Sequence, residues 1–280
     1  MDLAQYAAAH GLHRVGARPH LGAYLAETWS RRDFIWAMAR FRLRSSLEGN
    51  RLGILWLLLT PCLNALVYGL IFGILQGGAR GEDYVGRVVV GVFLWQFFAK
   101  SFSDGAKSIT KNVTLVQSLA FPRMTLPVAE VAEKFLSTLP SIGLLLIILP
   151  ILGHPPALSW LFIVPLLALY TLFNLGITMI AARLTVHLRD LTQLLPFVTR
   201  LLFYTSGVLF NVHTLFKDHP SVVAVYNFHP LYQVMELARN AFMGTEVIPI
   251  YWAYLSAWAV AIFLVGLLFF WVAEERYGRE

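Results

Sequence analysis

The hydrophobic positions of this chain gather into long runs instead of alternating with polar positions. A helix that crosses a bilayer needs about 20 mostly apolar residues. Four runs of this kind are plain, and two more are interrupted by charged residues such as Glu130 and Arg200. The pattern predicts an all-α polytopic membrane protein with six transmembrane helices, over residues 52–75, 85–102, 127–152, 158–184, 191–210 and 250–272.

Composition agrees with a membrane protein and excludes the ordinary soluble classes. Of the 280 residues, 58% are hydrophobic and 14% are charged, whereas a soluble domain has about 45–50% apolar and about 25% charged residues. The single cysteine, Cys62, excludes an intramolecular disulfide and a cysteine zinc cluster. The net charge is +6. In a membrane protein such an excess of Lys and Arg mostly lies in the cytoplasmic loops and sets the topology, so it does not indicate nucleic-acid binding.

The distribution of basic residues predicts which side of the membrane each loop faces. With the N-terminus in the cytoplasm, the inner segments hold 16 of the 22 Lys and Arg residues and the outer segments hold 4. Both termini are therefore expected in the cytoplasm. A leader over residues 1–51 and a tail over residues 274–280 would flank a membrane domain over residues 52–273. Residues 1–20 lack a continuous apolar core, so we expect no cleavable signal peptide.

Residues 30–46 predict an amphipathic helix that lies in the membrane–water interface. Ser30 and Asp33 match a capping box, an apolar stripe follows, and several arginines supply positive charge. Such a helix lies in the headgroup plane with its apolar side down. A solvated basic leader that only enforces topology is the alternative. The residues assigned to the interfacial helix are Arg31, Arg32, Phe34, Ile35, Met38 and Arg40.

Residues 213–248 lie on the outer side in this topology but do not resemble an ordinary loop. Pro220, Pro230 and Gly244 divide them into short pieces, of which two are apolar enough to be half-buried. The pattern is typical of a pair of short re-entrant helices, and protein or a wet cavity must surround irregular backbone at that depth. A folded extracellular cap is the alternative.

Motifs of nucleotide and metal chemistry are absent from the sequence. It has no G-x-x-x-x-G-K-[ST] and no H-E-x-x-H, and its eight histidines are scattered. We therefore expect no catalytic residue, no metal and no cofactor in this chain. Carriers driven by ion gradients keep ionisable residues near the membrane midplane, whereas Glu130, Glu133 and Lys134 lie near the start of a span. Glu130 and Lys134 are four residues apart and can pair on one helix face.

Two mixed stripes of aromatic and polar residues predict a path for a sugar chain. In the first span such a residue recurs at every fourth position, which places the set on one helix face. Aromatic rings stack on sugars, and amides and hydroxyls bond sugar hydroxyls. Interhelical hydrogen bonding, worth roughly 0.6 kcal/mol per contact, is the alternative for each residue, and Arg200 has both a structural and an anion-binding interpretation. The assigned path residues are Trp56, Thr60, Asn64, Tyr68, Thr199, Arg200, Phe203 and Tyr204.

The segment Leu115–Pro127 resembles a loop of the ABC-2 type permeases that export O-antigen, capsule and teichoic acid. Its most specific piece is the pattern F-P-R-x-x-L-P from Phe121 to Pro127. Three other pieces agree in order, and together they cover about residues 28–275; His229 stands where the family has Asn, and Arg200 and Asn50-Arg51 are further departures. The three pieces are Arg44–Leu47 with Gly53–Trp56 and Pro61, Arg189–Leu191 with Ser206–Val208, and His229–Tyr232 with Glu236 and Arg239.

The resemblance implies a homodimer of permeases bound to two copies of a cytoplasmic ABC ATPase, which would hold ATP and Mg²⁺. It also implies an interfacial helix, outer re-entrant helices, and a coupling helix between the second and third spans. That coupling helix would lie within residues 111–119, where a plain connector is the alternative. The residues expected to act in ATPase coupling are Lys111, Asn112, Leu115, Gln117 and Arg123.

Three functions remain open from the sequence. The first is the permease subunit of an ATP-driven exporter of a lipid-linked polysaccharide in a bacterial inner membrane, with O-antigen, teichoic acid or a galactan-type polymer as cargo. The second is an ABC-2 exporter of a drug or a small lipid. The third is an ion-gradient-driven carrier or a membrane-embedded enzyme, which would require carboxylates deep in the membrane.

Overall fold

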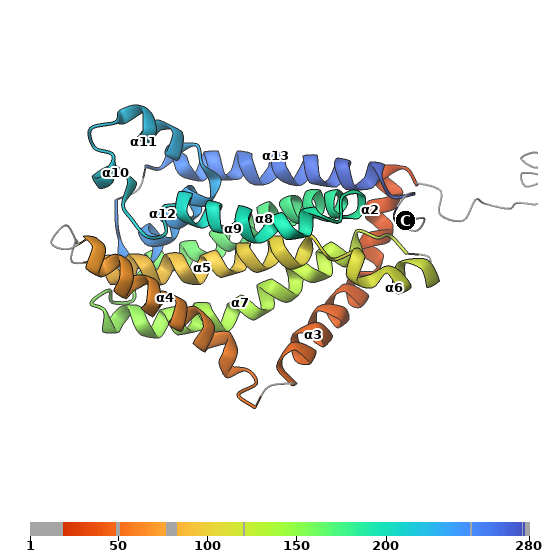
Figure 1. The fold of residues 1–280 in the computed structure, drawn as a ribbon, viewed down its shortest axis with the longest axis horizontal. Coiled ribbons are helices and arrows are strands. Elements are labelled where there is room, and N and C mark those ends of the chain that lie inside the picture. Colours follow the sequence, from red (N-terminus) through yellow and green to blue (C-terminus); the bar gives the residue numbers. More distant parts are fainter. Residues whose placement is uncertain are drawn as a thin grey trace, which may run out of the picture.

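A computed structural model describes residues 19–48, 51–76, 83–119, 121–246, 248–275 and 277. Residues 1–18 of the predicted leader, Asn50 and most of the predicted tail lie outside the described residues. The elements within those ranges are all helical, and the long helices run side by side in one bundle (Figure 1). This confirms the all-α class. The helices are α2 (Leu21–Ser30), α3 (Arg32–Glu48), α4 (Leu55–Gln76), α5 (Tyr84–Gly105), η2 (Thr110–Asn112), α6 (Val113–Ser118), α7 (Thr125–Ile151), η3 (Leu158–Phe162), α8 (Ile163–His187), α9 (Leu191–Thr205), α10 (Val212–Leu215), α11 (Pro220–Asn227), α12 (Pro230–Met243) and α13 (Ile250–Val272).

Five helical stretches within the described ranges are long and apolar enough to cross a membrane, one fewer than predicted. They are α4, α5, α7, η3 with α8, and α13. The predicted span over residues 191–210 differs, because α9 has only 15 residues and is therefore about 22 Å long, against a hydrocarbon core of about 30 Å. The backbone leaves the helix after Thr205, and Gly207 has a φ of +69°. The sixth span is therefore not confirmed.

Helix α5 lies in the middle of the bundle and packs against α4, α7, α8, α9 and α12. Its segment from Val88 to Trp95 is wholly buried. A helix that is apolar on all sides has no face to present to water. Its neighbours therefore cover it all round, and α5 forms the main hydrophobic core.

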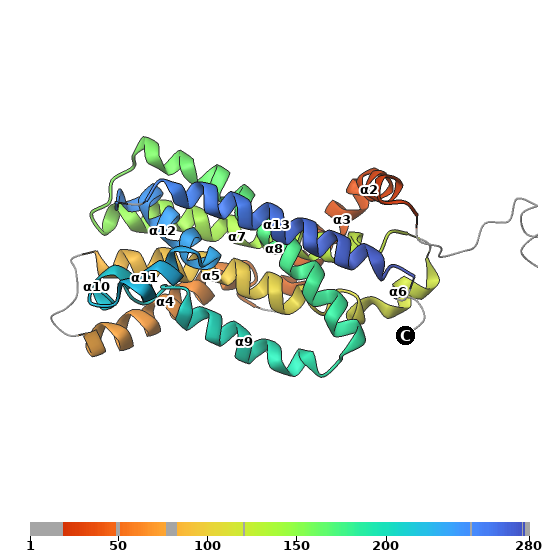
Figure 2. The same ribbon diagram turned by 90° about the horizontal axis from the view of Figure 1, so that it is seen from above.

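Helices α8 and α13 make the most extensive helix pair of the bundle (Figure 2). Two glycines allow their backbones to touch. A Cβ atom added to Gly176 would lie 2.5 Å from the carbonyl oxygen of Ile262, and one added to Gly266 would lie 2.3 Å from the carbonyl oxygen of Gly176. Small residues at such crossings are typical of helix packing in membranes.

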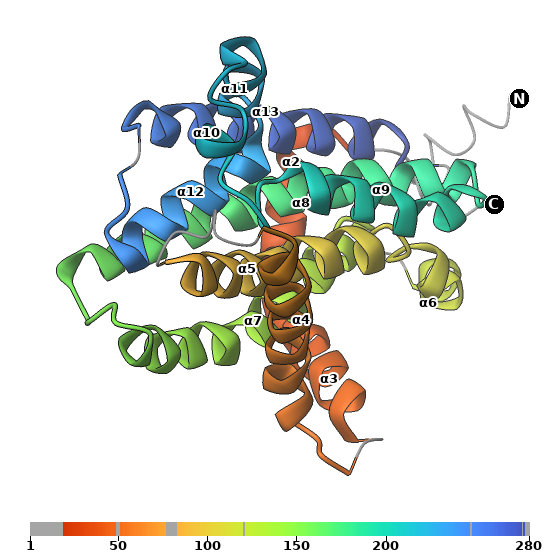
Figure 3. The same ribbon diagram turned by 60° about the vertical axis from the view of Figure 1, so that its left-hand side comes forward.

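The helix predicted over residues 30–46 corresponds to α3, except that a turn at Arg31 separates α3 from Ser30, the last residue of α2. That α3 lies in the membrane–water interface stays a prediction. Its predicted capping box is wrong, because Ser30 is the last residue of α2 and its hydroxyl donates to the carbonyl oxygen of Glu27 at 2.7 Å. Helix α3 packs on α7, and its buried residues are Ile35 and Ala39. Helices α3 and α4 converge toward residues 51–54, which stand away from the rest of the bundle (Figures 1 and 3).

Helices α6 and α11 lie at opposite ends of the bundle, and we name the two ends after them (Figure 1). At the α11 end, residues 213–248 form short helices that begin at Pro220 and Pro230, as the sequence predicts, and the structure adds the single turn of α10. Gly244 ends α12 in the left-handed conformation with a φ of +67°. Helix α12 is buried along most of its length against α13, α5 and α8, and whether it re-enters a membrane stays a prediction.

Candidate functional site

The two predicted stripes meet in a group of four aromatic rings, which we call the aromatic junction. Tyr68 of α4 and Phe203 of α9 have ring centroids 4.8 Å apart. Trp95 of α5 lies 5.3 Å from Phe203, and Tyr204 lies 5.6 Å from it. Such distances are favourable for aromatic pairs. The structure therefore joins α4 and α9 through side chains that meet over α5.

The polar members of the stripes are satisfied mostly within their own helices. The hydroxyl of Thr60 donates to the carbonyl oxygen of Trp56 at 2.8 Å. The hydroxyl of Thr199 donates to the carbonyl oxygen of Leu195 at 2.7 Å and lies 3.5 Å from the hydroxyl of Ser103 on α5. Asn64 is half-buried. Thr199 therefore has the interhelical contact of the alternative interpretation, whereas the hydrogen bond of Thr60 stays within α4. The role of both threonines in a path stays a prediction.

Two of the predicted path residues lie apart from the aromatic junction. Trp56 is 41% exposed near the start of α4, about 18 Å along the helix from Tyr68. Arg200 is exposed on α9 and has no ion pair with any acidic residue in the described ranges. Sequence reasoning missed Trp95, because a tryptophan within a wholly apolar run gives no periodic signal.

An apolar cavity of about 550 Å³ lies between α4 and α5, and none of the four rings of the aromatic junction lines it. Cys62 and Gly69 line it from α4, and Val89 and Phe93 line it from α5. Ile148 of α7 also lines it. The lone cysteine of the chain therefore faces an apolar space between two candidate spans.

The predicted coupling residues lie at the α6 end, in a short segment that projects beyond the long helices (Figure 1). We call residues 110–119 the coupling segment. Two of its side chains point back to α5 and the turn after it: the Nζ atom of Lys111 lies 3.7 Å from Asp104, and the amide of Asn112 donates to the carbonyl oxygen of Ser108 at 2.7 Å. In α6, Leu115 packs inward and Gln117 is exposed. The segment thus has an anchored side and a free side.

A cluster of buried charges lies between the coupling segment and α3, and we call it the charge cluster. The Nζ atom of Lys134 lies 2.6 Å from Glu133, 2.9 Å from Asp104 and 3.4 Å from Glu130, which confirms the predicted pair with Glu130. Arg42 of α3 also pairs with Glu130. Sequence reasoning missed Arg42 and Asp104, because they come from other helices. A cavity of about 260 Å³ adjoins the cluster, and Ser46, Lys111 and Asn112 complete its lining.

A second polar group at the α6 end joins three distant parts of the chain, and we call it the end clamp. The buried carboxylate of Glu274 accepts hydrogen bonds from the hydroxyl of Tyr24 at 2.7 Å, from the backbone N–H of Arg123 at 2.9 Å and from the Arg123 guanidinium at 3.4 Å. The backbone N–H of Met124 donates to the Tyr24 hydroxyl at 3.1 Å. Arg123, predicted to act in coupling, is therefore fixed to both ends of the described chain.

The environment of the end clamp raises the pKa values of Glu274 and Tyr24. Burial raises the pKa of the Glu274 carboxyl, and the hydrogen bonds from Arg123 and Tyr24 oppose that rise. Burial, followed by the neighbouring Glu274 carboxylate, raises the pKa of the Tyr24 hydroxyl well above its ordinary value. Tyr24 therefore stays a neutral hydrogen-bond donor across the physiological pH range.

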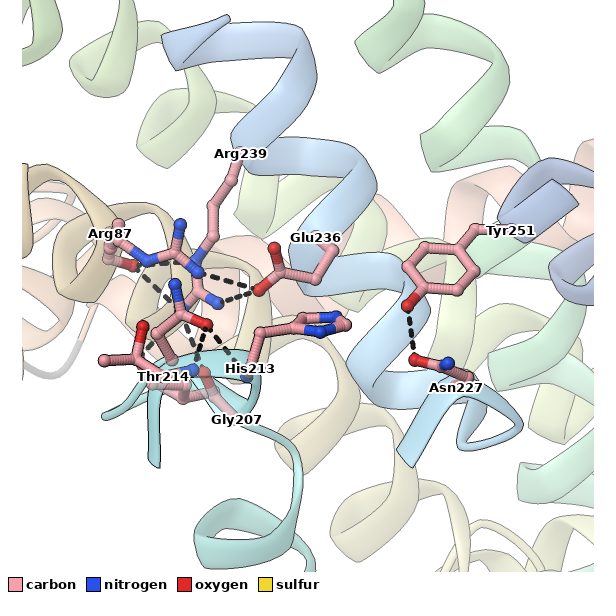
Figure 4. A network of polar contacts seen from close by, with 10 residues as sticks. Arg87, Gly207, His213, Thr214, Asn227, Glu236, Arg239 and Tyr251 are labelled. Atoms are coloured by element: carbon pink, nitrogen blue, oxygen red, sulfur yellow. Dashed lines mark hydrogen bonds and ion pairs between the residues drawn. The ribbon is translucent and has the colours of Figure 1, made fainter. Parts of the chain in front are cut away.

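At the α11 end, a buried arginine holds the end of α9 to α12 and α5 (Figure 4). The guanidinium of Arg239 donates to the carbonyl oxygens of Val208 at 2.9 Å and Gly207 at 3.0 Å, and to the carboxylate of Glu236 at 2.6 Å. The same carboxylate oxygen accepts from Arg87 of α5 at 2.9 Å. Carbonyl groups at the end of a helix lack intrahelical hydrogen-bond partners. Arg239 donates the missing hydrogen bonds to the carbonyl groups of Gly207 and Val208.

The residues assigned to the interfacial helix divide between the bundle and its outside. Ile35 is buried, and the ring of Phe34 lies 6.0 Å from that of Phe121. Met38 packs partly against a second, smaller hydrophobic core at the α6 end, to which Phe121 belongs. Phe34 is nevertheless 37% exposed, and the three assigned arginines are exposed, as are several other aromatic side chains of α2 and α3. The exposed arginines are Arg31, Arg32 and Arg40, and the other exposed aromatics are Trp29, Trp36 and Phe41.

Comparison with known proteins shows similarity along most of the chain. Two O-antigen export system permease proteins RfbA of Klebsiella pneumoniae are each 27% identical, over 248 and 252 residues, which is 88% of this chain and 94% of each relative. RfbA of Myxococcus xanthus is 26% identical over 211 residues, which is 75% of this chain and 80% of the relative. Residues 33–243 match the family model described as ABC-2 type transporter. Because this match covers more than half of the chain, it confirms the family resemblance: the chain belongs to the ABC-2 type transporter family of membrane subunits.

Proposed function

We propose that this chain is the permease subunit of an ATP-driven exporter that moves a lipid-linked polysaccharide from the cytoplasm to the outer side of an inner membrane. The observation that carries the proposal is the similarity to O-antigen export permeases over 88% of this chain and 94% of two relatives. Because the similarity extends over nearly the whole length of both chains, it favours a polysaccharide as the cargo of this chain over a drug or a small lipid.

Energy for transport would come from a partner, because this chain carries no P-loop motif. We assign that role to a cytoplasmic ABC ATPase, present in two copies and holding ATP and Mg²⁺. Its contact would be the free side of the coupling segment, where Gln117 is exposed. Lys111 and Asn112 support this assignment from the anchored side, since their contacts hold the segment against the bundle.

We place the α6 end in the cytoplasm. The end clamp brings Glu274, two residues after α13, to the same end as Tyr24 and the coupling segment, and the basic residues favour the cytoplasm for these segments. Single cysteines at Ser118 and Thr214, both exposed, test the orientation in a Cys62→Ser background. We expect an impermeant thiol reagent added to whole cells or spheroplasts to label position 214 only; labelling at position 118 instead would reverse the orientation.

The path would run between two copies of this chain. Helices α4 and α9 lie along the same side of the molecule, away from α13 (Figure 2). Tyr204 of α9 is 46% exposed and Trp56 of α4 is 41% exposed. A second copy facing this side would enclose the aromatic junction, and its rings would give a sliding polymer binding sites weak enough to leave.

Depletion of this chain from its host tests the proposed function. We expect a lipid-linked glycan to accumulate in the cytoplasmic leaflet, as detected by extraction and mass spectrometry, and to disappear when the chain is restored. A matched control restores a P-loop Lys→Ala variant of the partner ATPase together with the wild-type chain, and should still accumulate glycan. Accumulation of a drug or a small lipid, with no glycan, would refute the proposal.

A further inference from the structure

The end clamp combines backbone and side-chain contacts in a way that ordinary surface ion pairs do not. Glu274 is 2% exposed and Tyr24 is 1% exposed. Both carboxylate oxygens of Glu274 are used, because Oε1 accepts from Arg123 and Oε2 accepts from Tyr24. Two of the donors are backbone N–H groups, those of Arg123 and Met124. The contacts therefore fix the course of the backbone and not only the position of side chains.

These two N–H groups lie directly before α7, which begins at Thr125: Met124 is the N-cap, and Arg123 precedes it. The first N–H groups of a helix have no intrahelical partner, and a negative charge near them is favourable. The Tyr24 hydroxyl of α2 supplies this partner to the N–H of Met124. The Glu274 carboxylate, just after α13, accepts from the N–H of Arg123 and brings a negative charge near the start of α7. The start of α7 is therefore capped by residues that are 100 and 151 positions away in the sequence.

A small hydrophobic core lies at the same end, separate from the core around α5. It contains Tyr24 and Met124 of the end clamp, Val116 of α6, and Leu267 and Phe270 of α13. The coupling segment thus shares its core with α2, α8 and α13 instead of with α4 or α9. Motion imposed on α6 would pass into α7 and α13 through this core and the end clamp.

We propose that Tyr24 and Glu274 are positioning residues for energy coupling: with Arg123 they hold the coupling segment in a fixed place relative to α7 and α13, so that movement of the partner ATPase is transmitted to the membrane helices. This inference rests on the proposed function. Neither residue touches the cargo or ATP, and both act through the backbone at the start of α7. The N-terminal helix α2 thereby becomes part of the coupling machinery.

The test replaces Tyr24 with Phe, which removes one hydroxyl and leaves the ring in the small core. Tyr277→Phe is the matched control, because the Tyr277 hydroxyl lies in the same core but donates to the carbonyl oxygen of Phe270 at 3.0 Å and not to the end clamp. Glu274→Gln is a second variant, which removes the negative charge but keeps an oxygen acceptor for Arg123. Each variant is reconstituted with the partner ATPase in proteoliposomes, and glycan export and ATP hydrolysis are measured together.

We expect Tyr24→Phe to bind the ATPase and hydrolyse ATP but to export roughly fivefold less glycan per ATP, the effect of one ordinary hydrogen bond on an equilibrium. Glu274→Gln should change the same ratio in the same direction, and Tyr277→Phe should leave it unchanged. Hydrogen exchange should show that the Met124 N–H loses protection in Tyr24→Phe.

Two results would overturn the inference. One is an unchanged ratio of export to hydrolysis in both clamp variants. The other is an equal loss in Tyr24→Phe and Tyr277→Phe, which would reduce the end clamp to ordinary packing. Both results presuppose ATP-dependent glycan export by the wild-type complex; its absence would instead refute the proposed function.

Discussion

The crossing of α8 and α13 gives the sharpest prediction, because the contact is between backbones. In a Gly266→Ala variant, the new Cβ atom would lie 2.3 Å from the carbonyl oxygen of Gly176 and 3.0 Å from its carbonyl carbon and Cα atom. Ordinary van der Waals contact begins at 3.4 Å, so the helices must separate by about 1 Å at this point. No side chain can rotate away to relieve the clash, because all the atoms that it meets are backbone.

Overpacking in a well-packed core costs typically about 1–3 kcal/mol, and we expect Gly266→Ala to lie near the upper end of that range. The free energy of unfolding is measured by loss of helical circular dichroism during titration with a denaturing detergent. Gly143→Ala on α7 is the matched control, since nothing lies within 4 Å of its added Cβ atom. The control should be neutral or slightly stabilising, because alanine is the better helix former. Equal stability of the two variants would show that α8 and α13 do not approach this closely.

Three further predictions follow from the aromatic junction, the coupling segment and the cap of α12. Tyr68→Ala and Tyr204→Ala should each slow glycan export in proteoliposomes while dimer formation and ATPase binding stay normal; failure to assemble would make the rings packing contacts, and normal export would place the path elsewhere. A photo-crosslinkable residue at Gln117 should capture the ATPase, whereas one at the buried Val116 should not, and equal capture would contradict the assigned free side. His229 caps α12 by accepting a hydrogen bond from the N–H of Tyr232 at 3.2 Å, and burial lowers the pKa of His229 below 6.5. Because the unfolded chain then binds more protons below pH 6.5, the free energy of unfolding should decrease by up to about 1 kcal/mol as the pH is lowered through this range. His229→Asn, which keeps a capping acceptor, should reduce this pH dependence in thermal unfolding, and an unchanged pH profile would exclude His229 as its source.

The long apolar helices could be predicted from sequence because their signal is local. The predicted span over residues 250–272 coincides with α13, and the predictions for α5 and α7 are close. The prediction for residues 191–210 was too long, because apolar residues continue past Thr205 while the backbone does not stay helical. Gly207 is visible in the sequence, but its positive φ is held by Tyr232 packed beneath it and by Arg239 bonded to its carbonyl oxygen. Those contacts come from another helix and leave no local pattern.

In the candidate site, too, contacts within one helix could be predicted from the sequence, whereas contacts between distant segments could not. The pair of Glu130 and Lys134 follows from a spacing of four residues on one helix, and the structure confirms it. Arg42, which pairs with Glu130, lies 88 positions away in the sequence. Glu274, the centre of the end clamp, lies in a short segment after α13 that reads as an ordinary charged tail. Such residues are recognised only when the fold brings their partners together.

The positions of the buried polar contacts indicate which side of the bundle can open for a polymer. Buried polar networks fix both ends of the bundle, since the end clamp joins α2, α7 and α13, and Arg239 joins α12, α5 and the end of α9. Breaking a buried ion pair by removing one partner costs about 3–5 kcal/mol, so these joints resist separation. Helix α4 has no comparable joint among the described residues: it contacts α5 and α7, and its long exposed side is apolar. If two copies face each other across α4 and α9, the side that must part for the cargo is the side that the fold holds least firmly.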